Sequence, residues 1–364
     1  MAFIASKPAQ ILSLFSESGF SFPHFFFRKA SAHQPFRAMG KGSATPGGGN
    51  EQICPEARIR SGRKRDMPTL RLPRLASAEL PKPFGCYPFL LYLYRKYMNE
   101  MENHPVILSV AGSDCSGGAG IQADMKTISA LGGYAATAIT AITVQNTWGV
   151  AAVHPVPADV VRGQIEAVMD DLKPSAVKIG MIYDADMVGT IAACLRKYRP
   201  AHVVYDPVMV STSGKRLMTE EAVGRVKQEL LPLTTLVTPN LHEAEILSGE
   251  TAEGLQEMRE VARKLADTYH TSVLIKGGHL PGDKAFDLLR ASGTTLGYEQ
   301  PKIESRNLHG TGCTLSSAIA TYLARECSLQ DSVRQAKDYI TRSILAAKEL
   351  NIGHGNGPLW HFHK

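Results

Sequence analysis

The stretch VILSVAGSDCSGGAGIQAD, residues 106–124, decides the fold class of this chain. It begins with a short apolar run typical of a buried strand, passes through a turn rich in glycine, and enters a helical pattern at Ile121. Glycines in such a turn let the backbone approach a ligand closely, and amides at a helix start favour an anion or a polar ring. The turn matches neither the dinucleotide fingerprint G-x-G-x-x-G nor a Walker A loop.

Asp124 lies beside the apolar face of this helix, which Ile121, Met125, Ile128 and Leu131 are predicted to form. A tight strand-to-helix turn explains the glycines without any ligand, but it does not explain a carboxylate at this position. Open α/β sheets bind ligands in the crevice at the carboxyl ends of their strands. We therefore predict that Asp124 accepts hydrogen bonds from a polar ligand there.

Strands and helices alternate along the chain from Pro105 onward. Apolar, β-branched stretches predict further strands at 134–144, 176–180, 202–206, 235–239 and 272–278. Helical patterns lie near 158–172, 185–198, 219–230, 241–248, 255–269, 312–325 and 329–348. The segment 284–303 interrupts the alternation and is typical of a hairpin that turns near Ser292–Gly293. This order predicts one domain of the three-layer α/β/α class, with a mostly parallel central sheet and a small hairpin near 284–303.

The first 97 residues differ in composition from the remainder. They hold 15 Lys and Arg against 5 Asp and Glu, whereas residues 98–364 hold 25 against 29. A transit peptide, a basic arm that binds nucleic acid, and a disordered or non-native stretch ahead of a start at Met98 or Met101 all fit this pattern. We favour the last, so residues 1–100 are expected to be an extension and 101–364 the folded domain.

Cysteine spacing and hydropathy favour a cytoplasmic protein. No C-x-x-C pair occurs among the six cysteines, which argues for reduced thiols instead of a disulfide framework or a zinc site. The most apolar run, YPFLLYLY at 87–94, is far shorter than the roughly 18 residues of a membrane span.

Asn240 and Glu243 follow the predicted strand at 235–239 in the stretch TPNLHEAE. Their i, i+3 spacing puts an amide and a carboxylate on one face of a first helical turn. Such a pair suits a hydrated Mg²⁺ ion, which keeps several waters and takes few protein ligands. The same spacing is that of a helix capping box, and this motif by itself favours the capping interpretation.

Lys276 ends the predicted strand at 272–278 and is followed by two glycines. A lysine at the carboxyl end of a central strand is costly unless a negative group meets it. A nucleotide phosphate is one such group, and an ordinary solvated strand end is the alternative.

A second glycine turn, HGTGC at 309–313, leads into a helix with an apolar face. The amides around Gly310, Thr311 and Gly312 can form an anion hole for a phosphoryl group in transfer. The field of the helix is expected to lower the pKa of Cys313, whose thiolate could then accept a proton from a substrate hydroxyl. A small buried cysteine that fills a packing gap is the alternative.

Together these stretches resemble the ribokinase-like superfamily, and within it the hydroxymethylpyrimidine/phosphomethylpyrimidine kinase family of thiamine biosynthesis. The matching stretches are AGSDCSGGAGIQAD at 111–124, KIGM at 178–181, TPNLHEA at 238–244, KGGH at 276–279, HGTGCTLSSA at 309–318 and GPLWHFH at 357–363. The resemblance covers about 104–364. Cys115, where many relatives have proline, departs from the family pattern within a turn.

The resemblance implies phosphorylation of 4-amino-5-hydroxymethyl-2-methylpyrimidine by ATP with Mg²⁺, and then of the monophosphate to the diphosphate. It implies that Asp124, Gln145 and Gly112 contact the pyrimidine and that Met181 packs on its ring. An amide such as that of Gln145 can pair with a ring nitrogen and an exocyclic amine at once. The other implied roles are Mg²⁺ organisation through water for Asn240 and Glu243, neutralisation of nucleotide phosphates for Lys276, an anion hole for Gly310, Thr311 and Gly312, and the base for Cys313.

The resemblance leaves two other functions open. A pyridoxal or pyridoxine kinase of the same branch is one, and a pyrimidine-binding regulator with a nucleic-acid-binding arm is a more distant one. We favour the enzyme, with a small-molecule substrate, ATP, no nucleic acid and no membrane as partners. Relatives commonly form dimers, so a homodimer is expected. The histidines at 361 and 363 lack a third ligand of sensible spacing and are predicted to be packing residues.

Overall fold

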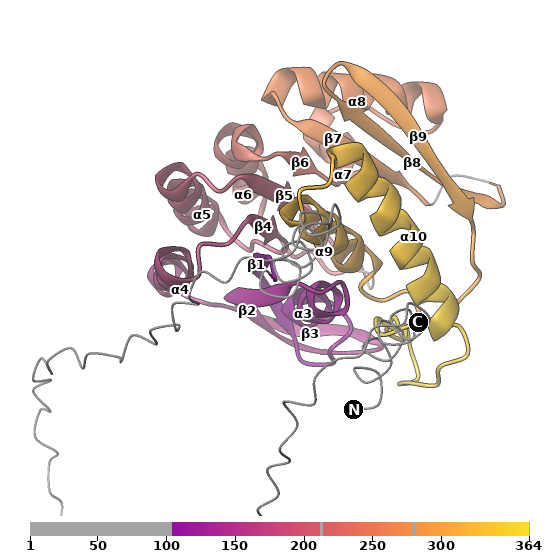
Figure 1. Cartoon of the computed structure of the whole chain (residues 1–364), viewed down its shortest axis with the longest axis horizontal. Helices are drawn as coiled ribbons and strands as arrows, with labels where there is room; N and C mark the ends of the chain where they lie inside the picture. The colour runs from indigo at the N-terminus through magenta and orange to yellow at the C-terminus, as the bar shows by residue number, and fades with distance from the viewer. Residues whose placement is uncertain (1–103, 212–213, 279–281, 364) are drawn as a thin grey trace, which may run out of the picture. The chain divides into compact units, whose positions relative to one another are not determined.

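The computed structural model describes residues 104–211, 214–278 and 282–363 (Figure 1). The predicted extension at 1–100 and the apolar run at 87–94 lie outside these residues. The strands are β1 (Val106–Asp114), β2 (Tyr134–Asn146), β3 (Gly149–Pro155), β4 (Ala176–Ile179), β5 (His202–Tyr205), β6 (Leu236–Val237), β7 (Ser272–Gly277), β8 (Lys284–Ala291) and β9 (Thr294–Pro301). The helices are α3 (Gly120–Ala130), α4 (Ala158–Asp171), α5 (Ala185–Tyr198), α6 (Glu220–Arg225), α7 (Leu241–Ser248), α8 (Leu255–Tyr269), α9 (Thr311–Ala324) and α10 (Leu329–Ala347).

One sheet contains all of these strands in the order β3-β2-β1-β4-β5-β6-β7-β8-β9. The strands from β2 to β7 in this order pair in parallel, whereas β3, β8 and β9 pair antiparallel to their neighbours. The sheet is therefore mostly parallel, as predicted. Parallel strands bring their carboxyl ends to one edge, which is where a ligand crevice forms in open α/β sheets.

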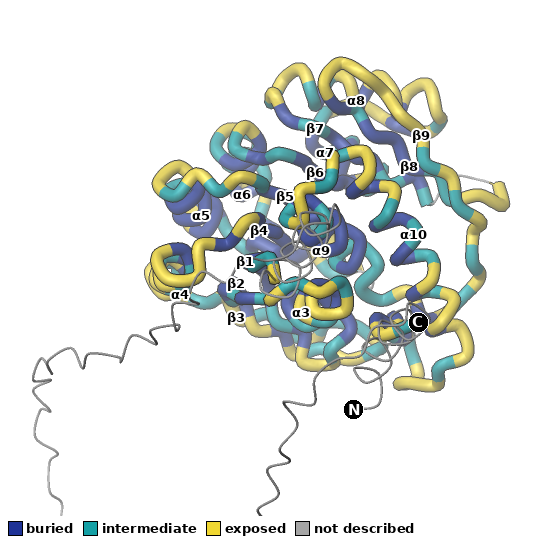
Figure 2. The backbone as a smooth tube through the Cα atoms, viewed as in Figure 1, coloured by how far each residue is buried: buried dark blue, intermediate teal, exposed yellow. Residues whose placement is uncertain are grey.

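Helices cover both faces of the sheet (Figure 1). Helices α4, α5, α7 and α8 pack on one face around Leu108 and Val177, and α3, α9 and α10 pack on the other around Ile107 and Val204. Burial is greatest in the central strands and on the helix sides that face them (Figure 2). This arrangement is the predicted three-layer α/β/α fold.

The hairpin of β8 and β9 turns at Ser292 and Gly293, as predicted. Both residues have positive φ angles, 47° and 77°, which the favoured two-residue hairpin turn requires. In the described part of the chain, none of the helices combines the length and the apolarity needed to cross a bilayer.

Three details of the sequence-based prediction were wrong. Met125 is 43 % exposed, because the buried arc of α3 runs through Ile121, Asp124 and Ile128 instead. The strand β3 was not predicted, since it lies at an edge of the sheet and none of its residues is fully buried. The strand β2 was predicted to be buried, but its C-terminal end is partly exposed, and Val144 there is 51 % exposed.

Candidate functional site

A cavity of about 650 Å³ opens at the carboxyl ends of the parallel strands. It is lined by ten of the eleven residues that the sequence predicted for the site, namely Gly112, Gln145, Met181, Asn240, Glu243, Lys276, Gly310, Thr311, Gly312 and Cys313. A smaller hollow of about 400 Å³ at the opposite end of β7 contains none of them. The chemistry-bearing residues therefore converge on the larger cavity.

The glycine turn before α9 forms one wall of this cavity. Gly310 occupies the N-cap position with a φ of 88°, and within the described residues no side chain caps this helix end. A Cβ atom on Gly310 would collide with the carbonyl oxygen of Gly118, so the two glycine turns touch backbone to backbone. A Cβ atom on Gly312 would lie 3.1 Å from Asp206 Oδ2 and 3.5 Å from Lys276 Nζ. A glycine-led helix start beside an ammonium group suits an anionic ligand.

Cys313 lies in the first turn of α9 and lines the cavity, but its acidity differs from the prediction. Burial raises the pKa of the Cys313 thiol to about 11, with the Asp124 and Asp206 carboxylates adding to the rise. Lys178 and the Gly120 amide lower this pKa without reversing the shift. The prediction that the helix field makes Cys313 a thiolate was therefore wrong, because loss of hydration outweighs the helix field here.

Lys276 meets a carboxylate that the sequence analysis did not single out. Its Nζ lies 2.6 Å from Asp206 Oδ1 and 3.9 Å from Glu243 Oε2, and its side chain is 18 % exposed. Burial lowers the pKa of Lys276, but the two carboxylates outweigh that effect and keep the amine charged. Asp206 follows β5 at its carboxyl end, and this position was the signal that could have revealed it.

Asn240 and Glu243 form the capping box that their spacing favours. The Asn240 side chain accepts a hydrogen bond from the Glu243 amide at 2.8 Å, and Glu243 Oε2 accepts one from the Asn240 amide at 2.8 Å. Burial raises the pKa of Glu243, opposed by the nearby Lys276. Since both residues also line the cavity, the capping role leaves them in reach of a ligand.

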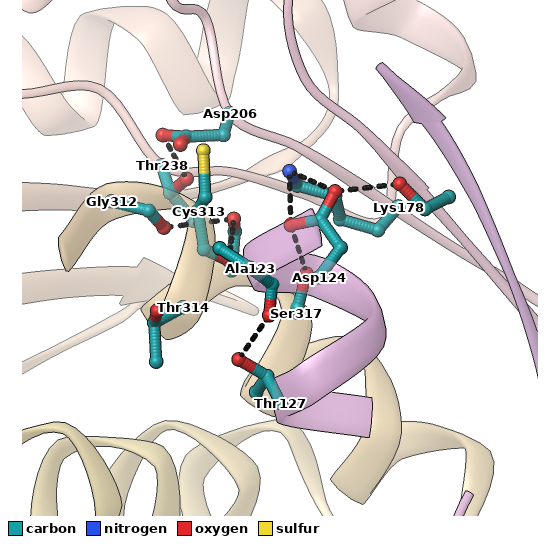
Figure 3. A network of polar contacts seen from close by, with 12 residues as sticks. Ala123, Asp124, Thr127, Lys178, Asp206, Thr238, Gly312, Cys313, Thr314 and Ser317 are labelled. Atoms are coloured by element: carbon teal, nitrogen blue, oxygen red, sulfur yellow. Dashed lines mark hydrogen bonds and ion pairs between the residues drawn. The ribbon is translucent and has the colours of Figure 1, made fainter. Parts of the chain in front are cut away.

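Asp124 does not line the cavity. Its carboxylate is fully buried and forms an ion pair with Lys178 on β4, at 2.8 and 2.9 Å (Figure 3). It also accepts hydrogen bonds from Ser109 on β1 at 2.6 Å and from Ser317 on α9 at 2.7 Å. With four hydrogen bonds from three side chains already in place, the prediction that Asp124 binds a ligand directly was wrong.

The Asp124–Lys178 pair nevertheless belongs to the architecture of the site. It joins α3, β1, β4 and α9, and Lys178 is one of the groups that lower the pKa of Cys313 (Figure 3). Removing one partner of such a buried pair would leave an uncompensated charge, which is strongly destabilising. Lys178 was missed as a contributor, although it lies within the KIGM stretch.

Gln145 and Met181 also line the cavity. Met181 is 7 % exposed, and a Cβ atom on Gly112 would lie 3.1 Å from its sulfur, so Gly112 provides room for that side chain. The amide of Gln145 contacts His309, which in turn contacts Asp114. Neither His309 nor Asp114 was predicted as a site residue, although His309 lies in one of the two glycine turns and Asp114 in the other.

The two C-terminal histidines are packing residues, as predicted. His361 Nε2 contacts Thr314 Oγ1 at 3.0 Å, and burial lowers the pKa of His361 to about 4. His363 Nε2 contacts Ser343 Oγ at 2.9 Å. Among the described residues, no group of three or more His, Cys, Asp or Glu side chains is arranged to hold a metal ion.

The chain matches a known protein family. Residues 114–360 match the phosphomethylpyrimidine kinase family model. The hydroxymethylpyrimidine/phosphomethylpyrimidine kinase of Rhizobium meliloti (strain 1021) is 50 % identical over 260 residues, 71 % of this chain and 97 % of that protein.

Solved structures agree with this assignment. The crystal structure of phosphomethylpyrimidine kinase from Clostridium difficile 630 matches with a TM-score of 0.60 and 42 % identity, over 66 % of this chain and 99 % of that one. The pyridoxal kinase of Staphylococcus aureus in complex with AMP-PCP and pyridoxal matches with a TM-score of 0.65 and 32 % identity, over 71 % and 94 %. The chain therefore belongs to the phosphomethylpyrimidine kinase family, whose ribokinase-like fold and kinase motifs it carries throughout the matched region.

Proposed function

We propose that this protein transfers the γ-phosphoryl group of ATP to the hydroxymethyl group of 4-amino-5-hydroxymethyl-2-methylpyrimidine, and then a second one to the monophosphate. The observation that carries the proposal is the cavity itself. It brings together an uncapped helix start with Cys313 and Lys276, which suits phosphates, and the side chains of Gln145 and Met181, which suit a polar aromatic ring.

Near the start of α9, the positive charge of Lys276 is already paired with carboxylates before a nucleotide binds. Lys276 stays protonated beside Asp206 and Glu243, so a charged ammonium group lines the cavity where phosphates would bind. The amides at the start of α9 would stabilise the charge on the phosphoryl group in transfer. Cys313 would accept the proton of the substrate hydroxyl when its thiol is ionised.

Magnesium fits the residues at the start of α7. Glu243 is a buried carboxylate that lines the cavity, and its Oε2 accepts the capping bond from the Asn240 amide. Together with the amide of Asn240 it would hold a hydrated Mg²⁺ ion through water, since that ion keeps most of its own waters. The ion would neutralise charge on the nucleotide phosphates.

A second candidate substrate is pyridoxal or pyridoxine, because the Staphylococcus aureus relative is a pyridoxal kinase solved with pyridoxal. Initial rates of the purified chain on the aminopyrimidine alcohol and on pyridoxal, measured side by side with ATP, separate the two. We expect a higher kcat/KM on the aminopyrimidine alcohol, and formation of its diphosphate. A higher value on pyridoxal would reverse the proposal.

We also propose a cytoplasmic homodimer. Reduced thiols support the compartment, since Cys115, Cys194, Cys313 and Cys327 are all free. Exposed apolar side chains near the β3 edge of the sheet support a dimer interface. Ile142 on β2 is 45 % exposed, and Trp148, in the turn between β2 and β3, is 70 % exposed.

Replacement of Gln145 by leucine tests the pyrimidine end of the cavity. We expect KM for the aminopyrimidine to rise while KM for ATP changes little, because a buried polar group of the ligand loses its partner at about 1–3 kcal/mol. Steady-state kinetics with each substrate varied in turn measures both constants. Equal damage to the two constants would point to a folding defect and contradict this role.

A further inference from the structure

Three side chains from distant parts of the chain meet at one edge of the cavity. They are Asp114 at the end of β1, Gln145 near the end of β2, and His309 just before α9. His309 Nε2 lies 2.9 Å from Asp114 Oδ2 and 2.9 Å from Gln145 Nε2. One ring nitrogen thus faces a carboxylate and an amide at the same time.

The ring of His309 is held in place by its surroundings. Its side chain is 14 % exposed, and it packs so closely on Gly118 that a Cβ atom there would collide with the ring. The backbone amide of His309 donates to the Gly357 carbonyl oxygen at 3.0 Å. The position of Nε2 is therefore set by the fold.

Asp114 can only accept hydrogen bonds from this ring. Its carboxylate already accepts from the Ser116 amide and hydroxyl and from the amides of Gly118 and Ala119. Burial would raise the pKa of Asp114, but the bonds from His309 and these groups lower it to about 2. Because the carboxylate is ionised, the proton between the two groups must sit on His309 Nε2.

That proton decides how the Gln145 amide is turned. An N–H of His309 facing the NH₂ group of Gln145 would set two donors against each other. The oxygen and nitrogen ends of an amide have nearly the same shape, so hydrogen bonding determines which end faces a neighbour. With the Gln145 amide rotated by half a turn, its oxygen shares the His309 Nε2–H with Asp114 Oδ2 in a three-centre hydrogen bond, and its NH₂ group is directed away from the ring.

We propose that His309, anchored by Asp114, is a positioning residue that fixes the Gln145 amide with its oxygen toward the imidazole and its NH₂ group available to the ligand, so that the site selects a 4-aminopyrimidine over its 4-oxo counterpart. This inference rests on the proposed function. The ring nitrogen of a 4-aminopyrimidine accepts from the amide N–H, and the amino group donates to the second lone pair of the amide oxygen.

A 4-oxo pyrimidine presents the opposite pattern, a ring N–H beside a carbonyl oxygen. To pair with it, the Gln145 amide must turn and set its NH₂ group against the N–H of His309. Leaving buried donors unpaired in this way corresponds to about a tenfold to hundredfold loss in kcat/KM. Discrimination against the oxo ring would thus come from a residue that need not touch the ligand.

The experiment measures kcat/KM for 4-amino-5-hydroxymethyl-2-methylpyrimidine and for its 4-oxo analogue in four proteins: the wild type, His309→Phe, Gln145→Leu and the double variant. We expect the wild type to prefer the amino compound, and His309→Phe to reduce that preference by about tenfold or more, mainly through a gain on the oxo analogue. In the Gln145→Leu background the same change at position 309 should leave the preference unaltered.

Further variants separate positioning from folding. His309→Gln retains a donor near the place of Nε2 and should keep most of the preference. His309→Leu removes the donor with a smaller side chain, and it serves as the donor-free variant if His309→Phe does not fold. We expect it to lose the preference as predicted for His309→Phe. Unchanged preference in a folded variant without a donor overturns the inference. So does an equal loss with and without Gln145, since His309 would then act on the ligand directly. A wild type that phosphorylates neither ring would instead refute the proposed function.

Discussion

Cys313→Ser is expected to lower kcat by about 10²- to 10⁴-fold while ATP binding stays nearly intact. A serine hydroxyl fills a similar volume in the first turn of α9, but it does not ionise in the range where a thiol does. The change therefore removes the proposed base and leaves the helix start in place. Single-turnover rates at saturating ATP give the effect on chemistry, and a nucleotide titration gives the effect on binding.

The pH dependence of the wild type tests the same role. Because the pKa of Cys313 is raised to about 11, its thiolate fraction grows with pH throughout the neutral and mildly alkaline range. We expect kcat/KM for the alcohol to rise between about pH 7 and 9, and Cys313→Ser to lack this rise. A serine variant within about threefold of the wild type, with an unchanged pH profile, would make Cys313 a packing residue only.

Lys276→Met is expected to slow both phosphoryl transfers by about 10²-fold or more, and the second transfer more than the first. The second step brings a phosphorylated substrate against the γ-phosphate of ATP, so negative groups crowd the site and a lost cation counts for more. The ratio of monophosphate to diphosphate, followed by phosphorus NMR or anion-exchange separation, should shift toward the monophosphate.

Stability has to be separated from catalysis in this variant. Lys276→Met leaves the buried Asp206 without its ion-pair partner, which is expected to cost about 3–5 kcal/mol in the free energy of unfolding. The double variant Lys276→Met, Asp206→Asn removes both charges and is the matched control. We expect chemical denaturation to show that the double variant regains most of the stability, whereas its transfer rates stay low.

Two outcomes would contradict this prediction. Equal slowing of both transfers would mean that Lys276 acts on ATP alone, without a special role when the second phosphate arrives. Full activity in the stable double variant would mean that the ammonium group is structural, serving to pair Asp206.

Most of the fold could be predicted from the sequence because local patterns of apolar residues indicate its strands and helices. Apolar β-branched runs and helical periods identify β1, β2, β4, β5, β6 and β7 and the helices on both faces, and turn residues such as Ser292–Gly293 mark the hairpin of β8 and β9. The strand β3 was not predicted because it is partly exposed at the sheet edge, and its sequence therefore lacks a clear alternation of apolar and polar residues. Met125 was misplaced because one step along a helix is enough to turn a side chain out of the core.

A residue's place in the cavity was predictable where it follows from a position at a strand or helix end, as for Lys276 and Gly310. It was not predictable where the role depends on a partner far along the chain. Asp206 meets Lys276 across 70 residues, and Asp114 meets His309 across 195. The predicted lowering of the Cys313 pKa was wrong for a related reason. The position of a residue at a helix start can be read from the sequence, but the depth of burial that raises the pKa cannot.

The backbone contact between Gly118 and Gly310 has a mechanical consequence. These two turns lead into α3 and α9, and neither backbone can shift toward the other without a collision. The spacing between the two glycine turns is thereby fixed when the chain folds. Under the proposed function, the native state would therefore hold the geometry that aligns the two reactants before either of them binds.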